Sequence, residues 1–242
     1  MPMTSLSYLR LAAVIVIGLC LAGCGRSESY RYKLTFAVNT PEGIKKASSV
    51  VQVTFWPVSI PASGIMHGLN GEALYLDLGA GKKPLIAMLT SQLHPKYGKN
   101  VRWSRDAGPD DNLLSQLYGP ILPDLLDDVA RLARARGTRK IVPNDLPDLV
   151  TFADVNDPAT VIEVNRNDLQ ATLGTGVSWN EITLECTDEP ITTGIENKLP
   201  WLLDYYRNNL RLDGANTISK DALANILGWE DFGQSDDLKR SK

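Results

Sequence analysis

The feature that most constrains the fold is an alternating run at residues 30–38. Tyr30, Tyr32, Leu34, Phe36 and Val38 are apolar or aromatic, and most of the residues between them are polar. Successive side chains of a β-strand point to opposite faces, so this period of two predicts a strand with one buried face. The buried face needs another layer of structure against it, which points to a packed sheet.

Further apolar runs separated by turn residues predict additional strands. The nearest is Val50–Pro57, which we expect to pair with the first strand as an antiparallel hairpin or meander with a longish loop that includes Pro41-Glu42-Gly43. The other predicted strands are Glu72–Leu78, Pro84–Thr90, Leu146–Phe152, Thr160–Val164 and Trp179–Cys186.

Helical periodicity is clearest over Ile121–Arg136, where one apolar stripe is flanked by early acidic and late basic residues, and Gly137 supplies a stop. Shorter helices are predicted over Asn167–Leu173, Lys198–Leu210 and from Ser219, as N-cap, to Leu227. Strands before and between helices predict an α+β fold. We expect an antiparallel or mixed sheet with several packed helices, forming one domain over residues 30–232.

The N-terminus carries an apolar run that differs from the strand and helix patterns of the body. Leu11–Gly23 is an unbroken run of 13 apolar or small residues. A helix needs about 20 residues to cross the hydrocarbon of a bilayer, so the run is too short for a comfortable permanent anchor. It fits the apolar region of an export signal.

The run ends in Leu21-Ala22-Gly23-Cys24, which resembles the lipobox of bacterial lipoproteins. The resemblance implies a cleaved signal peptide over residues 1–23, a cut between Gly23 and Cys24, and acylation of Cys24 with fatty acids such as palmitate. Residues 24–29 would then form a tether to the membrane. The alternatives are an ordinary signal peptide with a chance cysteine, or a short uncleaved anchor, since Arg10 is the single basic residue before the run.

The residue after the cysteine bears on location. In enteric lipoproteins an Asp there favours the inner membrane, whereas this chain has Gly25. The resemblance therefore implies an outer-membrane protein that faces the periplasm in the cell envelope.

Composition limits the function classes. Removing residues 1–23 leaves 24 basic and 28 acidic residues, a net charge of 24 − 28 = −4, which argues against a nucleic-acid partner. The lipobox resemblance implies that Cys20 leaves with the signal and that Cys24 is acylated, so we expect Cys186 alone to remain and no internal disulfide to form. We expect Cys186 to be a buried, unreactive thiol. The polar tail 233–242 is predicted to be disordered.

No catalytic or ligand-binding motif that the sequence suggests has all of its required residues at the required spacing. Gly79-Ala80-Gly81-Lys82-Lys83 lacks the spacing of a phosphate-binding loop and reads as a turn. Asp154-Val155-Asn156-Asp157 begins like a calcium loop, but Pro158 and Ala159 replace the required residues, which favours an Asx turn. His67 and His94 lie in no zinc-hydrolase pattern. We expect no cofactor, no metal and no catalytic residue, although a pair of carboxylates acting in hydrolysis stays open.

Five cations in ten residues form a basic cluster: Arg131, Arg134, Arg136, Arg139 and Lys140. They could bind anionic headgroups, lipopolysaccharide phosphates or an acidic partner. The alternative is a helix C-terminus with its favoured cations, followed by a solvated loop.

Two further features of the chain concern a partner surface and a family resemblance. Pro200-Trp201-Leu202-Leu203 could form a partner-binding surface or dock into the sheet. The body also resembles an uncharacterised family of proteobacterial proteins in the stretches Tyr30–Val53, Leu146–Val161 and Ile191–Leu202, which implies no activity.

The sequence therefore supports three hypotheses for the function of the chain. The preferred one is a membrane-anchored envelope lipoprotein that binds a protein or envelope component. The alternatives are an envelope hydrolase with a carboxylate site, and a lipoprotein that binds a small ligand or metal near residues 154–157.

Overall fold

The computed structural model describes residues 26–58, 64–89, 113–120 and 122–234. The predicted signal segment, residues 1–23, and His94 lie outside these ranges. Within them, no helix has the length and apolar character required to cross a membrane.

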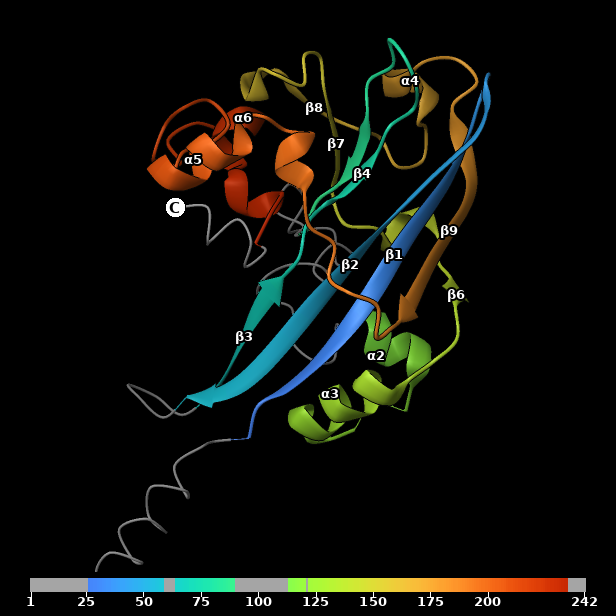
Figure 1. Ribbon diagram of the computed structural model, residues 1–242, viewed down its shortest axis with the longest axis vertical. Coiled ribbons are helices and arrows are strands. Elements are labelled where there is room, and N and C mark those ends of the chain that lie inside the picture. Colours follow the sequence, from blue (N-terminus) through green and yellow to red (C-terminus); the bar gives the residue numbers. More distant parts are fainter. Residues whose placement is uncertain (1–25, 59–63, 90–112, 121, 235–242) are drawn as a thin grey trace, which may run out of the picture.

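The first sheet is five-stranded and antiparallel, with strand order β3-β2-β1-β9-β6 (Figure 1). Its strands are β1 (Glu28–Thr40), β2 (Gly43–Val58), β3 (Gly64–Asn70), β6 (Arg139–Lys140) and β9 (Ser178–Cys186). Thr40 pairs with Gly43, so β1 and β2 are joined by two residues and the predicted longish loop is wrong. Gly43 has φ +115°, which a tight turn demands of this position.

A second sheet, also antiparallel, has strand order β4-β5-β7-β8. It contains β4 (Leu74–Leu76), β5 (Leu85–Ala87), β7 (Leu149–Phe152) and β8 (Val161–Glu163). The predicted α+β class is therefore confirmed. Two antiparallel sheets replace the one antiparallel or mixed sheet that was expected, because the chain leaves the first sheet after β3.

The two central strands of the second sheet, β5 and β7, are buried on both faces. Leu85 and Leu149 belong to a first core that also contains the apolar face of β1, with Phe36 fully buried. Their neighbours Ile86 and Val150 point the other way, into a second core under the C-terminal helices. The molecule is thus layered, with the second sheet between the first sheet and the C-terminal segment (Figure 1).

Short helices cover these sheets: α2 (Leu113–Tyr118), α3 (Leu125–Arg134), α4 (Gln170–Leu173), α5 (Leu202–Asn208) and α6 (Leu223–Ile226). Single 3₁₀ turns lie at η3 (Pro143–Asp145), η4 (Pro158–Thr160), η5 (Ile195–Asn197) and η6 (Trp229–Asp231). α2 and α3 pack under the first sheet, and α5 and α6 lie at the opposite end of the molecule (Figure 1).

The helix boundaries correct several predictions. α3 begins at Leu125, because Asp124 caps it by accepting the Asp127 N–H, and it ends at Arg134, before the expected stop at Gly137. Ser219 is not the cap of the last helix, since α6 begins at Leu223 and the Ser219 N–H donates to Asn225 Oδ1.

The C-terminal end of the described chain is held in place. Gly233 forms a bridge with Glu72, and the Gln234 N–H donates to the Gly71 carbonyl at 2.9 Å. These two residues of the predicted tail 233–242 thus make backbone contacts with the body. Residues 235–242 lie outside the described chain.

Candidate functional site

The residues proposed for signal cleavage and lipidation, Gly23 and Cys24, lie outside the described chain. The structure does locate the start of the body, because β1 begins at Glu28. Glu28 and Ser29, the last two residues of the predicted tether 24–29, belong to β1. Arg26 pairs with Glu28 at 2.8 Å and with Asp127 at 2.6 Å, which attaches this segment to the first turn of α3.

The basic cluster is largely occupied by partners within the protein. Arg131 donates to Asp128 Oδ1 at 2.7 Å and to the Tyr118 carbonyl at 2.6 Å. Arg136 forms an ion pair with Asp188, and Lys140 pairs with Glu181 at 2.7 Å. These contacts neutralise three of the cations.

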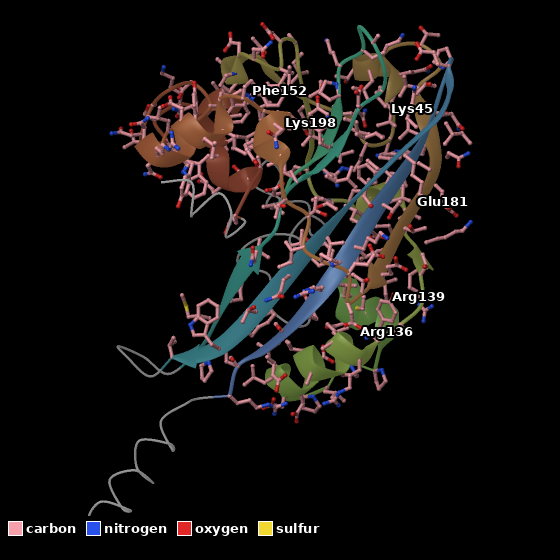
Figure 2. The ribbon with its side chains drawn as sticks, in the orientation of Figure 1. Lys45, Arg136, Arg139, Phe152, Glu181 and Lys198 are labelled. Atoms are coloured by element: carbon pink, nitrogen blue, oxygen red, sulfur yellow. The ribbon has the colours of Figure 1, made fainter. Side chains whose placement is uncertain are left out.

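The remaining two cations of the cluster, Arg134 and Arg139, have different surroundings. The Arg139 guanidinium lies 4.8 Å from the centre of the Tyr118 ring, and Arg134 has no ion-pair partner within the described ranges. Arg136 and Arg139 lie near the end of α3, and Glu181 is further along β9 (Figure 2). Four of the five cations therefore make separate structural contacts. Arg139 and Lys140 lie in β6 rather than in a solvated loop, and polyanion binding stays a prediction.

The acidic segment 154–157 is organised as two turns. Asp154 Oδ1 accepts the Asn156 N–H at 2.9 Å, and Asp157 Oδ1 accepts the Ala159 N–H at 3.0 Å at the start of η4. This geometry confirms the Asx turn. In the described part of the chain, no three His, Cys, Asp or Glu side chains gather as ligands of one metal ion.

Two other interpretations of the sequence are confirmed. Cys186 is buried at the end of β9, and burial raises the pKa of its thiol to about 11. Trp201 docks against the second sheet, where its indole N–H donates to the Val155 carbonyl at 3.1 Å and its ring contacts Phe152.

The glycine-rich segment is a turn, as expected. It joins β4 to β5, with the Lys82 N–H donating to the Gly79 carbonyl at 3.1 Å. Gly79 has φ +108°, which requires glycine there.

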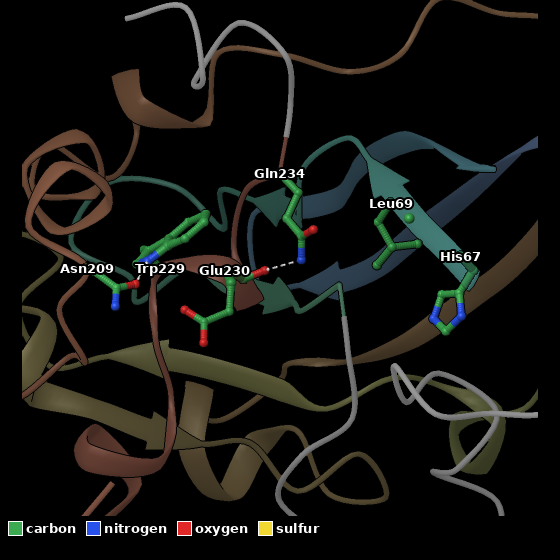
Figure 3. Close-up of a pocket in the computed structure, with 7 residues that line it drawn as sticks. His67, Leu69, Asn209, Trp229, Glu230 and Gln234 are labelled. Carbon is green, nitrogen blue, oxygen red and sulfur yellow. Dashed lines mark hydrogen bonds between the residues drawn. The ribbon is translucent and has the colours of Figure 1, made fainter. Parts of the chain in front are cut away.

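A pocket of about 360 Å³ lies between β3 and the C-terminal segment. Its lining comprises His67, Gly68 and Leu69 from β3, together with Asn209, Trp229, Glu230 and Gln234. Figure 3 shows these side chains around the open space, with the Gln234 amide donating to the Glu230 carbonyl. Sequence reasoning missed this pocket because its two walls are far apart in the chain.

The polar groups of the pocket are mostly engaged. Glu230 pairs with Arg211 at 2.8 Å, and the Trp229 indole N–H donates to Asn209 Oδ1 at 3.2 Å. One carboxylate held by an arginine does not provide the acid and base that glycoside hydrolysis requires. The pocket is better suited to holding a small polar molecule against an indole ring than to carboxylate chemistry.

Comparison with known proteins finds no matching family model, no matching curated protein and no matching solved structure. The resemblances to lipoproteins and to an uncharacterised proteobacterial family stay predictions.

Proposed function

We propose that this chain is a lipoprotein of the bacterial cell envelope whose body binds a protein or another envelope component. The observation that carries the proposal is Leu21-Ala22-Gly23-Cys24 directly after a 13-residue apolar run. The start of β1 at Glu28 supports it, because a folded body then follows the acylated cysteine after three residues. Gly25 favours the outer membrane, facing the periplasm.

Binding is preferred over catalysis because four groups of the described chain that could react are buried or engaged within the fold. The Cys186 thiol is buried, the Asp154 and Asp157 carboxylates hold turns, and Glu230 is neutralised by Arg211. Side chains held in this way stabilise a scaffold and leave its surface to recognise a partner.

Replacing the lipidation residue tests the anchor. Cells that express the full chain with a C-terminal tag are grown with an alkyne fatty acid. The parent chain should incorporate the label and fractionate with membranes, whereas Cys24→Ala should lose the label and accumulate unprocessed. Cys186→Ala is the matched control and should be labelled like the parent. Equal labelling of Cys24→Ala would contradict the proposal.

A second candidate, binding of a small polar ligand, is favoured by the pocket at Trp229. A panel of sugars and amino acids is added to the purified protein, and the midpoint of thermal unfolding is measured. A ligand at 100 times its Kd stabilises the native state by about 2.7 kcal/mol. The shift should disappear in Trp229→Ala. A panel without any shift in the parent chain would remove this candidate.

A further inference from the structure

One end of the β2–β3 ribbon carries an exposed apolar surface, which we call the apolar tip: Trp56, Pro57, Ile65 and Met66. Ile65 and Met66 are 42% and 52% exposed, among the most exposed large apolar side chains of the described chain. The sequence around the tip is also unusual. Residues 47–71 contain no Asp, Glu, Lys or Arg, although 22% of the whole chain is charged.

The apolar tip is apolar on both faces of the ribbon. Pro57 pairs with Ile65, and Trp56 pairs with Met66. Adjacent residues of a strand point to opposite faces, so the first pair lies on one face and the second pair on the other. A partner protein docked on the sheet would cover one face. Apolar side chains on both faces suit an end that is surrounded by an apolar medium.

Side chains at this end of the ribbon pack against one another and against β1. Tyr30 stacks on Phe55 with ring centres 6.4 Å apart, and Phe55 contacts His67 on β3. The Trp56 ring lies over Gly68, where an added Cβ would be only 3.1 Å from Trp56 Cη2. The indole therefore packs against the ribbon while its outer part stays exposed.

The apolar tip lies at the end of the molecule where the described chain begins. Glu28 pairs with Phe55, the residue before Trp56 (Figure 1). Cys24 precedes Glu28 by four residues, so an extended connection spans at most about 14 Å. The opposite end of β2, at Ile44, lies 12 residues from Trp56, or about 40 Å away along the strand.

The ion pairs near the tip join one cation to two acids. Arg26 is paired with both Glu28 and Asp127, and no other cation is paired with these acids among the described residues. Attraction to anionic lipid headgroups therefore has little basis here. Burial of apolar and aromatic side chains is the interaction that this end of the molecule offers, and tryptophan is enriched at the level of the headgroups.

We propose that the apolar tip inserts into the lipid surface beside the acylated cysteine, so that the membrane holds the body at two points. This inference rests on the proposed function, since it takes the acyl chains of Cys24 as the first point. The long β1–β2 hairpin then points away from the membrane, with Ile44 at its far end.

A fluorescent probe at each end of β2 and β3 tests the insertion. The acylated full chain is reconstituted into phosphatidylcholine vesicles as Ile65→Cys or Ile44→Cys, each labelled at neutral pH with an environment-sensitive fluorophore. Ile44 is 61% exposed and is the matched control at the other end of the sheet. The parent protein should take up no fluorophore, because the Cys186 thiol is buried with a raised pKa.

In vesicles, the emission of the probe at Ile65 should move to shorter wavelength, and lipids with brominated acyl chains should quench most of it. The probe at Ile44 should keep its aqueous spectrum and escape quenching. Both effects at Ile65 should persist in high salt, because screening weakens the attraction of charged groups and leaves apolar burial intact.

The remaining outcomes separate this inference from the proposed function. An acylated protein whose two probes both stay in water, or are quenched equally, contradicts the insertion and leaves the anchor intact. A shielded probe at Ile65 that brominated lipid does not quench would show that a protein, such as a second copy, covers the tip. A preparation that mass spectrometry finds without fatty acid overturns the proposed function, and the insertion with it.

Discussion

Thr151 is fully buried in β7, and its hydroxyl oxygen has no hydrogen-bond partner among the described residues. An unpaired buried hydroxyl costs free energy, whereas a methyl group of the same shape does not. Thr151→Val should therefore raise the free energy of unfolding by about 1 kcal/mol, measured by urea denaturation. Thr151→Ser keeps the hydroxyl and removes the methyl, so it should lower stability. A loss of stability in Thr151→Val would show that the hydroxyl has a partner.

Asp128 shows the opposite situation, a buried carboxylate surrounded by donors. It accepts the Ser115 hydroxyl at 2.5 Å, the Leu122 N–H at 3.1 Å and the Arg131 guanidinium at 2.7 Å. Burial favours the neutral acid, but the hydrogen bonds from Ser115, Arg131 and Leu122 outweigh it and hold the pKa of Asp128 below its ordinary value. The folded protein therefore favours the charged form.

Asp128→Asn should lower the free energy of unfolding by about 2 kcal/mol at pH 7, because the charge-assisted hydrogen bonds are lost. The folded pKa lies below the unfolded one. The contribution of Asp128 is therefore complete above the unfolded pKa and is lost as the pH falls through the folded value. The parent and the variant should converge in acid, as urea titrations from pH 7 to pH 3 would reveal. A difference that does not change with pH would contradict this role of the charge.

At the scale of elements, Gly71 allows the chain to leave β3 and enter the second sheet. Its φ is +153°, and an added Cβ would lie 3.0 Å from Val51 Cα, a backbone atom of β2. Gly71→Ala should therefore lower the free energy of unfolding by about 2 kcal/mol or more. Gly64→Ala, where a Cβ meets nothing within 4 Å, should change stability little. The comparison is made by thermal unfolding, and equal effects of the two substitutions would contradict the close approach to β2.

The sequence predicts elements where a local pattern matches their environment. β1 was predictable because Tyr30 and every second residue to Val38 lie in the first core, whereas most residues between them are only partly buried. β5 is a continuous apolar run, and Thr151 is the one polar residue of β7. Such runs are typical of a sheet covered on both faces, but they do not reveal that the covering layers are different cores. The split into two sheets is a tertiary property.

The strands that the sequence does not predict lack an alternating or continuous apolar pattern. β3 contains two glycines and no alternation, and it is a strand because it pairs with β2. β6, at Arg139–Lys140, was interpreted as a basic loop because cations dominate it, yet it pairs with β9. The pocket could not be predicted, because His67 and Trp229 are 229 − 67 = 162 residues apart and only the complete fold brings them together.

At the scale of the whole molecule, the shared second sheet couples the two cores. Phe36 lies in the first core and Phe152 in the second, and both are buried. Unfolding of either core exposes one face of β5 and β7, so we expect one cooperative transition, in agreement with the single domain predicted over residues 30–232.

Substitution in each core tests this coupling. Phe36→Ala and Phe152→Ala should each lower the free energy of unfolding by about 3–5 kcal/mol. Near-UV circular dichroism and far-UV circular dichroism should still follow one common transition in both variants. Two separated transitions, each sensitive to one substitution, would indicate that the cores unfold independently.

The position of β1 between β2 and β9 has a consequence for the time course of folding. Tyr32 pairs with Val51 on one side and with Cys186 on the other, and the second partner is 186 − 32 = 154 residues away. Closing such a long loop gives the sheet a high contact order, which slows folding. In a chain exported as proposed, the β1–β2 hairpin is synthesised early, but the first sheet cannot be completed until β9 has also been synthesised. If the chain is exported in this way, slow closure of the sheet would leave time for the unfolded chain to be threaded before its native topology forms.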